Sequence, residues 1–327
     1  MTTVVLMALV KTIVLLVVLL TLFGFLVWVE RKMIARFQIR VGPNRVGPFG
    51  LLQLLADAIK LLFKEDTLPN GANKLMHALA PAISLATALA VFAVIPFGEP
   101  VSLFGQQIEL WVANVDVAVL YVMAAGALGI YGIVLGGWSS NNKYSLLGGV
   151  RSSAQLISYE ISLGLALVGV VMLAGSLSLV QIVQAQSIPF ILLEPLGFIV
   201  FLIAGMAESN RPPFDLPEAD TELTGGYLTE YGGFKFAMFY MAEYLNMVAI
   251  CALITTLYLG GWRGPWLPPL AWFVIKVAAL IFLFLWLRAT FPRVRYDRLM
   301  RLGWLVLLPL ALVNIFVTAA WMIVLKA

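Results

Sequence analysis

Eight long apolar runs dominate this sequence, and each is long enough to cross a lipid bilayer. A transmembrane helix needs about 20 consecutive apolar residues. In lipid, backbone polar groups must be hydrogen-bonded within the protein, so such runs form helices. The sequence therefore predicts an all-α polytopic membrane protein with about eight transmembrane helices, forming a single integral membrane domain over residues 1–327. The expected helices lie roughly at Thr3–Val29, Leu75–Pro96, Val117–Trp138, Ala154–Ala174, Pro189–Ala207, Phe236–Gly260, Leu270–Leu287 and Leu302–Leu325.

The distribution of basic residues predicts the orientation of these helices. Cytoplasmic loops carry more Lys and Arg than outer loops. The loops after the first, third and seventh runs hold most of them, whereas the opposite loops hold almost none besides Arg263. We therefore expect the odd-numbered loops in the cytoplasm and both termini on the outer side. The residues that decide this are Arg31, Lys32, Arg36, Arg40, Arg45, Lys60, Lys64, Lys74, Lys143, Arg151, Arg288, Arg293, Arg295, Arg298 and Arg301.

The first of these loops contains an amphipathic segment, Phe49–Lys64. Gln53, Asp57, Lys60 and Lys64 recur at the spacing of one helix face, and Leu and Ile take the opposite face. The segment is too short to span a bilayer. It predicts a cytoplasmic-side helix that lies in the membrane interface, or one that forms a wall of a cavity opening toward lipid; the two readings are compatible.

The composition excludes several kinds of electron-carrying site. The chain has one Cys, Cys251, and one His, His77. An iron–sulfur cluster needs about four Cys ligands, and a disulfide or a bis-His haem needs a second Cys or His. No glycine-rich phosphate motif follows a predicted strand. The chain alone has no evident group to carry electrons, so we interpret Cys251 as a packing residue and His77 as a loop or interface residue. The net charge of +4 reflects orientation and does not indicate nucleic-acid binding.

The loop Ala207–Lys235, between the fifth and sixth runs, is acidic although it lies on the cytoplasmic side. Six carboxylates fall within 23 positions, and only Arg211 and Lys235 oppose them. One interpretation is a solvated acidic face that contacts a basic partner. For the group we favour a hydrated proton path, because crowded carboxylates titrate as a coupled set. A metal site is the weaker option, since hard cations need an ordered cage of oxygens. The acids are Glu208, Asp215, Glu218, Asp220, Glu222 and Glu230.

Two further carboxylates, Glu160 and Glu243, fall inside predicted transmembrane helices. Intramembrane acids are costly and usually face the bundle interior or a wet cavity. A buried carboxyl group without a cation can bind and release protons near neutral pH. With Glu208, these two would complete an acidic group near the cytoplasmic side. The alternative is a permanently protonated Glu in a helix-packing hydrogen bond.

Basic and apolar residues from distant parts of the chain predict a tunnel. Arg31 and Arg40 come from the loop after the first run, and Arg288 and Arg293 from the loop after the seventh. If they lie beside the amphipathic helix, they form an apolar tunnel with a charged lining. Such a tunnel suits a long isoprenoid with a polar head. The alternative is that each Arg anchors a helix end by the positive-inside rule.

Several motifs, taken in order and spacing, resemble the H-type (NuoH) membrane subunit of respiratory complex I, NADH-quinone oxidoreductase. The likeness covers essentially the whole chain, and the family also has eight transmembrane helices. The loop after Arg211 is richer in Pro than the family pattern, and Asp220 stands where the family often has Glu. The motifs are Glu30–Lys32, Arg40–Pro48, Ala56–Lys60, Gly137–Glu160, Ala207–Asp215, Met241–Tyr244 and Phe291–Met300.

The resemblance implies specific roles for these residues. It implies a subunit that docks the hydrophilic redox arm onto the membrane arm in a bacterial plasma (inner) membrane. Quinone is then a substrate, and iron–sulfur clusters and FMN sit on partner subunits. The implied partners are the hydrophilic quinone-site and iron–sulfur subunits, the small membrane subunits and the antiporter-like subunits, besides membrane lipid. By matched position, the quinone chamber includes Arg31, Arg40, Asp57, Arg288 and Arg293, and the proton path includes Glu160, Glu208, Glu218, Asp220, Glu222, Glu230 and Glu243.

These observations together predict a subunit of a proton-translocating NADH:quinone oxidoreductase that holds no redox centre, catalytic residue or metal of its own. It would admit quinone and couple quinone reduction to proton translocation along Glu208, Glu160 and Glu243. A near alternative is the equivalent subunit of a related hydrogenase or deazaflavin-dependent dehydrogenase complex. A stand-alone secondary transporter is the alternative from another class, and the lack of an internal repeat argues against it.

Overall fold

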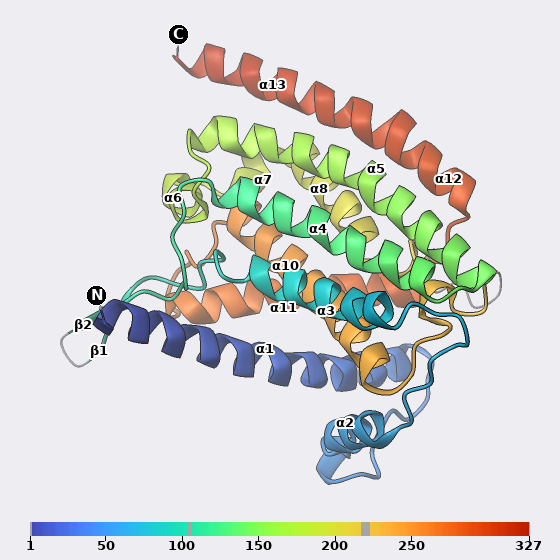
Figure 1. Cartoon of the computed structure of the whole chain (residues 1–327). Coiled ribbons are helices and arrows are strands. Elements are labelled where there is room, and N and C mark those ends of the chain that lie inside the picture. Colours follow the sequence, from blue (N-terminus) through green and yellow to red (C-terminus); the bar gives the residue numbers. More distant parts are fainter. Residues whose placement is uncertain (1, 104–105, 217–222, 327) are drawn as a thin grey trace.

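The computed structural model describes residues 2–103, 106–216 and 223–326, and nearly all of its regular structure is helical (Figure 1). Within these residues, seven helices are long and apolar enough to cross a membrane, and α8 is a shorter apolar helix. The predicted all-α polytopic architecture is thereby confirmed. The long helices are α1 (Thr2–Phe37), α3 (Lys74–Val91), α4 (Ala118–Ser139), α5 (Lys143–Ala174), α10 (Gly233–Tyr258), α11 (Pro269–Thr290), and α12 (Tyr296–Arg301) continued through the π-helical turn η3 (Leu302–Leu307) into α13 (Leu308–Lys326).

The fifth apolar run does not form the continuous helix expected at Pro189–Ala207. It is divided into α7 (Phe190–Leu193) and α8 (Pro195–Glu208), after the short helix α6 (Leu179–Ala185). The break falls at Glu194, which has φ −134° and ψ 57°. Proline has no N–H to donate and disfavours helical geometry in the residue before it. At about 1.5 Å per residue, α8 is only about 21 Å long, shorter than the ~30 Å hydrocarbon core of a bilayer.

The helix α10 is the centre of the bundle. It packs against α3, α8 and α11, and Figure 1 places it among them. Small side chains at Ala249, Cys251 and Ala252 are almost fully buried and let neighbouring backbones approach closely, as is usual for helices in membranes. The prediction that Cys251 is a packing residue is confirmed.

Polar residues define the starts of the two helices that follow loops at one end of the bundle. The Asn73 side chain accepts a hydrogen bond from the Met76 N–H at 3.3 Å, and the Asn142 side chain accepts one from the Tyr144 N–H at 3.0 Å. These caps satisfy N–H groups that lack partners within a helix. The helix α5 ends at Gly175, whose φ of 68° is left-handed geometry that glycine adopts without strain.

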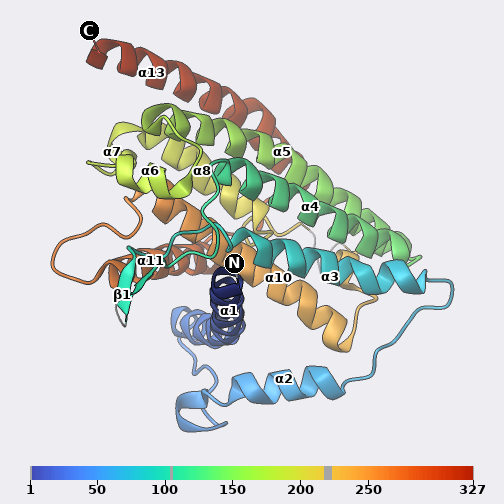
Figure 2. The ribbon, with the colours of Figure 1, turned by 60° about the vertical axis from the view of Figure 1, so that its left-hand side comes forward.

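The amphipathic helix α2 (Gln53–Phe63), preceded by the 3-10 turn η1 (Pro48–Gly50), lies apart from the main bundle (Figure 2). None of its residues is buried, and Leu55, Ile59 and Phe63 are exposed. At the opposite end of the bundle, β1 (Val101–Leu103) pairs with β2 (Gln106–Ile108) in an antiparallel hairpin. The helix α1 begins and α13 ends at this same end of the bundle (Figure 1).

Candidate functional site

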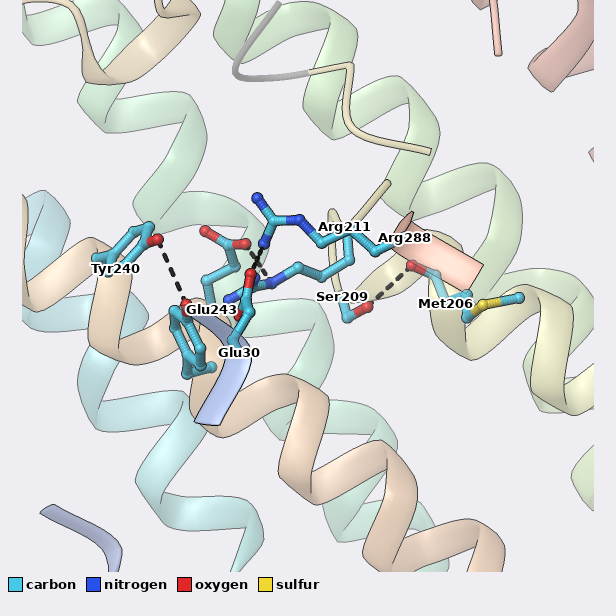
Figure 3. A network of polar contacts seen from close by, with 8 residues as sticks. Glu30, Met206, Ser209, Arg211, Tyr240, Glu243 and Arg288 are labelled. Atoms are coloured by element: carbon cyan, nitrogen blue, oxygen red, sulfur yellow. Dashed lines mark hydrogen bonds and ion pairs between the residues drawn. The ribbon is translucent and has the colours of Figure 1, made fainter. Parts of the chain in front are cut away.

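The segment that follows α8 folds back into the helix bundle instead of extending into solvent. Gln155 of α5 holds it, because its side-chain amide donates to the Ala207 carbonyl at 2.7 Å and to the Phe214 carbonyl at 2.8 Å. The Ser209 hydroxyl donates to the Met206 carbonyl at 2.9 Å. These bonds carry Arg211 inward until only 4% of it remains exposed. Figure 3 shows the guanidinium among side chains from three other parts of the chain.

Arg211 bridges two carboxylates that come from different helices. Its Nη1 lies 3.1 Å from Oε2 of Glu30, near the end of α1, and its Nε lies 2.6 Å from Oε1 of Glu243 on α10. Arg288, at the end of α11, also pairs with Glu30 (Figure 3). The group therefore joins two cations to two anions. Removing one member of such a buried group leaves an uncompensated charge, which is strongly destabilising.

Aromatic side chains cover the Arg211 guanidinium. It lies 3.9 Å from the centre of the Tyr244 ring, and the Tyr244 and Tyr240 hydroxyls are 3.4 Å apart. Burial alone would lower the pKa of Arg211. The neighbouring carboxylates of Glu243 and Glu30 outweigh that effect and raise this pKa well above its ordinary value. Arg211 therefore stays charged, and any change in the charge of this group must occur on its carboxylates.

Sequence reasoning missed the roles of Glu30 and Arg211. Glu30 lies beside Arg31 and Lys32, so the sequence suggests an ordinary charged residue at a helix end. Arg211 is one of only two cations in an acidic loop, and nothing in the sequence distinguishes it. The interpretation of Glu243 as an acid without a cation is wrong, because Arg211 pairs with it. The one available signal was that Glu30 and Arg211 each border a long apolar run.

A cavity of about 70 Å³ brings three of the predicted proton-path acids together. Glu160 of α5, Glu208 at the end of α8 and Glu243 of α10 all line it. Oε2 of Glu208 is buried and has no hydrogen-bond partner among the described residues. The volume is enough for several water molecules, since each needs about 10–15 Å³ measured this way. Other polar residues in the lining are Ser84, Thr87, Ser209, Asn210 and Asn246.

Of the remaining predicted acids, the two that the structure describes, Asp215 and Glu230, do not line this cavity. Glu230 accepts a hydrogen bond from the Asn142 side chain at 2.6 Å, near the start of α5. Asp215 is half-buried in the segment after α8. The structure does not describe Glu218, Asp220 and Glu222, so their predicted roles in the proton path remain predictions.

A separate groove of about 990 Å³ lies between α1, α2 and α10, and two of the predicted quinone-chamber residues line it. Arg31 Nη1 lies 2.7 Å from Oδ2 of Asp57, and the Gln53 amide donates to Oδ1 of Asp57 at 2.9 Å. The lining is mostly apolar, with Leu54, Leu61 and similar residues. One wall of the groove is therefore α2, in agreement with the cavity-wall reading of the amphipathic segment.

The other three predicted chamber residues lie elsewhere. Arg40 lines a smaller pocket of about 530 Å³ that shares Arg31 with the groove. Arg288 and Arg293 line neither pocket. Arg288 pairs with Glu30. One terminal nitrogen of Arg293 is buried without a hydrogen-bond partner among the described residues.

His77 is the residue whose environment differs most from expectation. It is fully buried near the start of α3, and its ring stacks on Tyr231 with centres 4.0 Å apart. Its interpretation as a loop or interface residue is therefore wrong. The hydropathy of the flanking residues could not reveal this, because Tyr231 is 154 positions away in the chain.

The match with known proteins covers nearly the whole chain. The pattern of the NADH dehydrogenase family matches residues 10–319. The chain is 57% identical to an H-type subunit of NADH-quinone oxidoreductase from Syntrophobacter fumaroxidans, over 96% of this chain and 95% of that protein. It is 56% identical to an H-type subunit from Geobacter metallireducens, over 94% of each chain, and 55% identical to the one from Thermomicrobium roseum, over 93% of each. With this likeness along its full length, the chain belongs to the NADH dehydrogenase family, among the H-type subunits of NADH-quinone oxidoreductase.

Proposed function

We propose that this chain is the membrane subunit of a proton-translocating NADH:quinone oxidoreductase that forms part of the quinone chamber and couples quinone reduction to proton movement. The names of its relatives support the subunit assignment. The electron carriers, iron–sulfur clusters and FMN, belong to partner subunits. The hydrophilic quinone-site and iron–sulfur subunits, the small membrane subunits and the antiporter-like subunits complete the assembly, which sits in the bacterial plasma membrane.

The groove between α1, α2 and α10 serves as the entrance for quinone. Its apolar lining suits an isoprenoid tail. The Arg31–Asp57 pair and Arg40 in the adjoining pocket supply polar contacts for the head group. Arg288 and Arg293 act deeper in the chamber, where Arg288 holds Glu30. Reducing a quinone to a quinol consumes two electrons and two protons, and the quinol is neutral. The site gains negative charge when the electrons arrive before the protons, or when its own side chains supply those protons.

The observation that carries the proposal is the bridge that Arg211 forms between Glu30 and Glu243. Glu30 is held from the other side by Arg288, and Glu243 lines the cavity that contains Glu160 and Glu208. A proton that binds Glu243 removes its charge and leaves Arg211 to pair with Glu30 alone. Conversely, negative charge near Arg288 weakens its hold on Glu30 and draws Arg211 away from Glu243. In a poorly screened interior these interactions are strong, so the bridge transmits a charge change from one side to the other.

The acids around the cavity then carry the proton. Glu208, Glu160 and Glu243 form the cavity side of the path, and Glu218, Asp220, Glu222 and Glu230 form its loop side. Because Glu208, Glu160 and Glu243 line one cavity, they exchange protons as one coupled group. Water in the cavity connects them, since a proton crosses between carboxylates through bridging hydrogen bonds.

The experiment that tests the proposal is Glu30→Gln. Gln keeps the size of the side chain and an oxygen that accepts from both guanidinium groups, but it carries no charge. We expect the complex to assemble and to oxidise NADH with a soluble artificial acceptor at the normal rate. Quinone reduction and proton uptake by inverted membrane vesicles, normalised to assembled complex, should both fall by more than about tenfold, which corresponds to ~1.4 kcal/mol in the barrier.

The matched control is Glu109→Gln, since Glu109 is exposed beside β2, at the end of the bundle opposite α2. It should leave all three activities unchanged. Normal quinone reduction and proton uptake in Glu30→Gln would show that the bridge plays no part in coupling.

A further inference from the structure

One face of α4 is made of glycines, and each of them faces an oxygen atom of another element. Gly126, Gly129, Gly132 and Gly136 are three, three and four residues apart, so they lie in one line along the helix. A Cβ atom at Gly126 would lie 3.1 Å from Oε1 of Glu208, and one at Gly129 would lie 3.1 Å from Oγ1 of Thr87.

The same pattern continues along the next two turns of α4. A Cβ atom at Gly132 would lie 2.2 Å from Oγ of Ser84. One at Gly136 would lie 3.1 Å from Cζ of the Phe239 ring and 3.6 Å from the Tyr231 hydroxyl, in ordinary van der Waals contact with it. Four oxygen atoms therefore follow one another along the seam between α3 and α4. From Gly126 to Gly136 the helix rises about 15 Å.

The polar atoms along this seam are buried and incompletely paired. Oγ of Ser84, which is 6% exposed, and Oε2 of Glu208 have no hydrogen-bond partner among the described residues. Buried polar atoms normally have partners, and water supplies them where protein does not. The cavity that contains Glu208 extends along Thr87 and Ser84, which gives such water room.

At the Gly136 end, the seam reaches the side of the bundle where α4 turns into α5. The Tyr231 hydroxyl lies 3.3 Å from Oγ of Ser139, in the last turn of α4. The next residue, Ser140, donates to the Gly136 carbonyl at 2.7 Å. Tyr231 also lines the groove beside α2. In the proposed orientation this end faces the cytoplasm, so the seam joins that side to Glu208.

We propose that the α3–α4 seam is a proton uptake route, in which the hydroxyls of Tyr231, Ser84 and Thr87 hold a file of water that delivers protons to Glu208. The inference rests on the proposed function, and the seam is the route by which protons enter the same path. Each hydroxyl both donates and accepts a hydrogen bond, so it passes a proton along without keeping it. A proton enters at the Tyr231 end and leaves onto the Glu208 carboxylate, and no electron is transferred. Gly126, Gly129 and Gly132 keep the seam open, because a Cβ atom at any of them would crowd the oxygen opposite.

The first test compares two changes at Thr87. Thr87→Val preserves the shape and removes the hydroxyl, whereas Thr87→Ser retains it. We expect Thr87→Val to lower quinone reduction and proton uptake about tenfold, each normalised to assembled complex. It should also enlarge the solvent deuterium isotope effect on the rate of quinone reduction. Thr87→Ser should retain most of both activities. The Thr87 hydroxyl donates to the Ile83 and Ser84 carbonyls of its own helix at 3.0 Å. Thr12→Val is the matched control, because the exposed Thr12 hydroxyl likewise donates to a carbonyl of its own helix, that of Ala8.

The second test narrows the seam instead of removing a hydroxyl. Gly129→Ala places a methyl group against Oγ1 of Thr87 and should also lower turnover about tenfold. Gly132→Ala is a poorer choice, since its Cβ atom would also crowd the Ala80 carbonyl at 2.9 Å. The control is Gly164→Ala in α5, whose Cβ atom would meet only the end of the Met123 side chain at 3.4 Å. It should leave turnover unchanged.

The outcomes separate this route from the proposed function. If Thr87→Val and Gly129→Ala turn over normally while Glu208→Gln is inactive, the route is wrong and the acidic path stands. Equal losses of quinone reduction in Thr87→Val and Thr87→Ser would also overturn the route. They would indicate that Thr87 acts through the packing of its side chain and not through its hydroxyl. If Glu208→Gln itself keeps normal quinone reduction and proton uptake, the proposed function fails.

Discussion

Arg211 has the largest consequences of any single residue in this protein. It is a cation with 4% exposure, and it satisfies carboxylates from α1 and α10 at once. A buried ion pair adds little net stability when intact, because the charges lose their hydration. Removing one partner of the pair is strongly destabilising, since the remaining charge is left buried and unpaired. The role of Arg211 is therefore to hold Glu30 and Glu243 close together.

This reasoning predicts the behaviour of a double variant. Arg211→Met should destabilise the protein by about 3–5 kcal/mol, because Glu243 loses its partner. Adding Glu243→Gln should recover part of that loss, since the unpaired charge is then removed. The measurement is the unfolding temperature of the purified complex for each single variant and for the double variant. If the double variant is no more stable than Arg211→Met alone, the pairing of Arg211 with Glu243 does not contribute to stability as the geometry implies.

Among the elements, α2 differs from all others because it stands outside the bundle yet shapes a groove. The Arg31–Asp57 ion pair connects α2 to α1. Asp66, three residues after the end of α2, pairs with Lys235 at the start of α10 at 2.7 Å. One side of α2 lines the groove and the other is exposed, as at Ile59. An amphipathic helix held by these two ion pairs is suited to bound an opening toward lipid.

Two tryptophan substitutions on α2 distinguish its two sides. Ala58 lines the groove, so Ala58→Trp should narrow it and raise the KM for a long-chain quinone severalfold, with less effect on a short-chain analogue. The neighbouring Ile59 does not line the groove and is 55% exposed, so Ile59→Trp should leave both KM values unchanged. Steady-state quinone reduction in membranes gives both constants. Equal effects of the two substitutions would argue against the groove as the quinone entrance.

In the whole molecule, the α4–α5 turn and the loops that connect α1 to α3 and α11 to α12 lie at one end of the bundle. The helix α1 begins and α13 ends at the other end, beside the β1–β2 hairpin (Figure 1). The excess of Lys and Arg in the odd-numbered loops predicts that the first end faces the cytoplasm. It therefore predicts that both termini lie on the outer side of the membrane.

A reporter that fluoresces only in the cytoplasm tests this orientation. Inserted near Asn141, in the turn between α4 and α5, it should fluoresce. Fused after the last residue of the chain, it should remain dark, because the terminus lies outside. The control for expression is immunodetection of both fusions in the membrane fraction. Fluorescence of the terminal fusion would contradict the eight-crossing topology, which puts five crossings between Asn141 and that terminus.

Much of the architecture followed from the sequence, because lipid leaves few choices. Long apolar runs must form helices that satisfy their own hydrogen bonds, and the spacing of Gln53, Asp57 and Lys60 was enough to predict α2. The break at Glu194 shows the limit of run length as a signal. Pro195 was visible in the sequence, but only the fold shows that this run is divided into α7 and α8.

The candidate site was predictable in its residue types and not in its pairings. Glu160, Glu208 and Glu243 were identifiable because placing an acid in or at the end of an apolar membrane helix costs free energy, so such residues usually have a function. Their meeting around one cavity, and the seam of oxygens opposite the α4 glycines, depend on which helix faces bear on one another. Glu30 and Arg211 are 181 positions apart. Only the packing of α1, α10, α11 and the segment after α8 brings these charges into contact, and a buried charge is then stable only with its partner beside it.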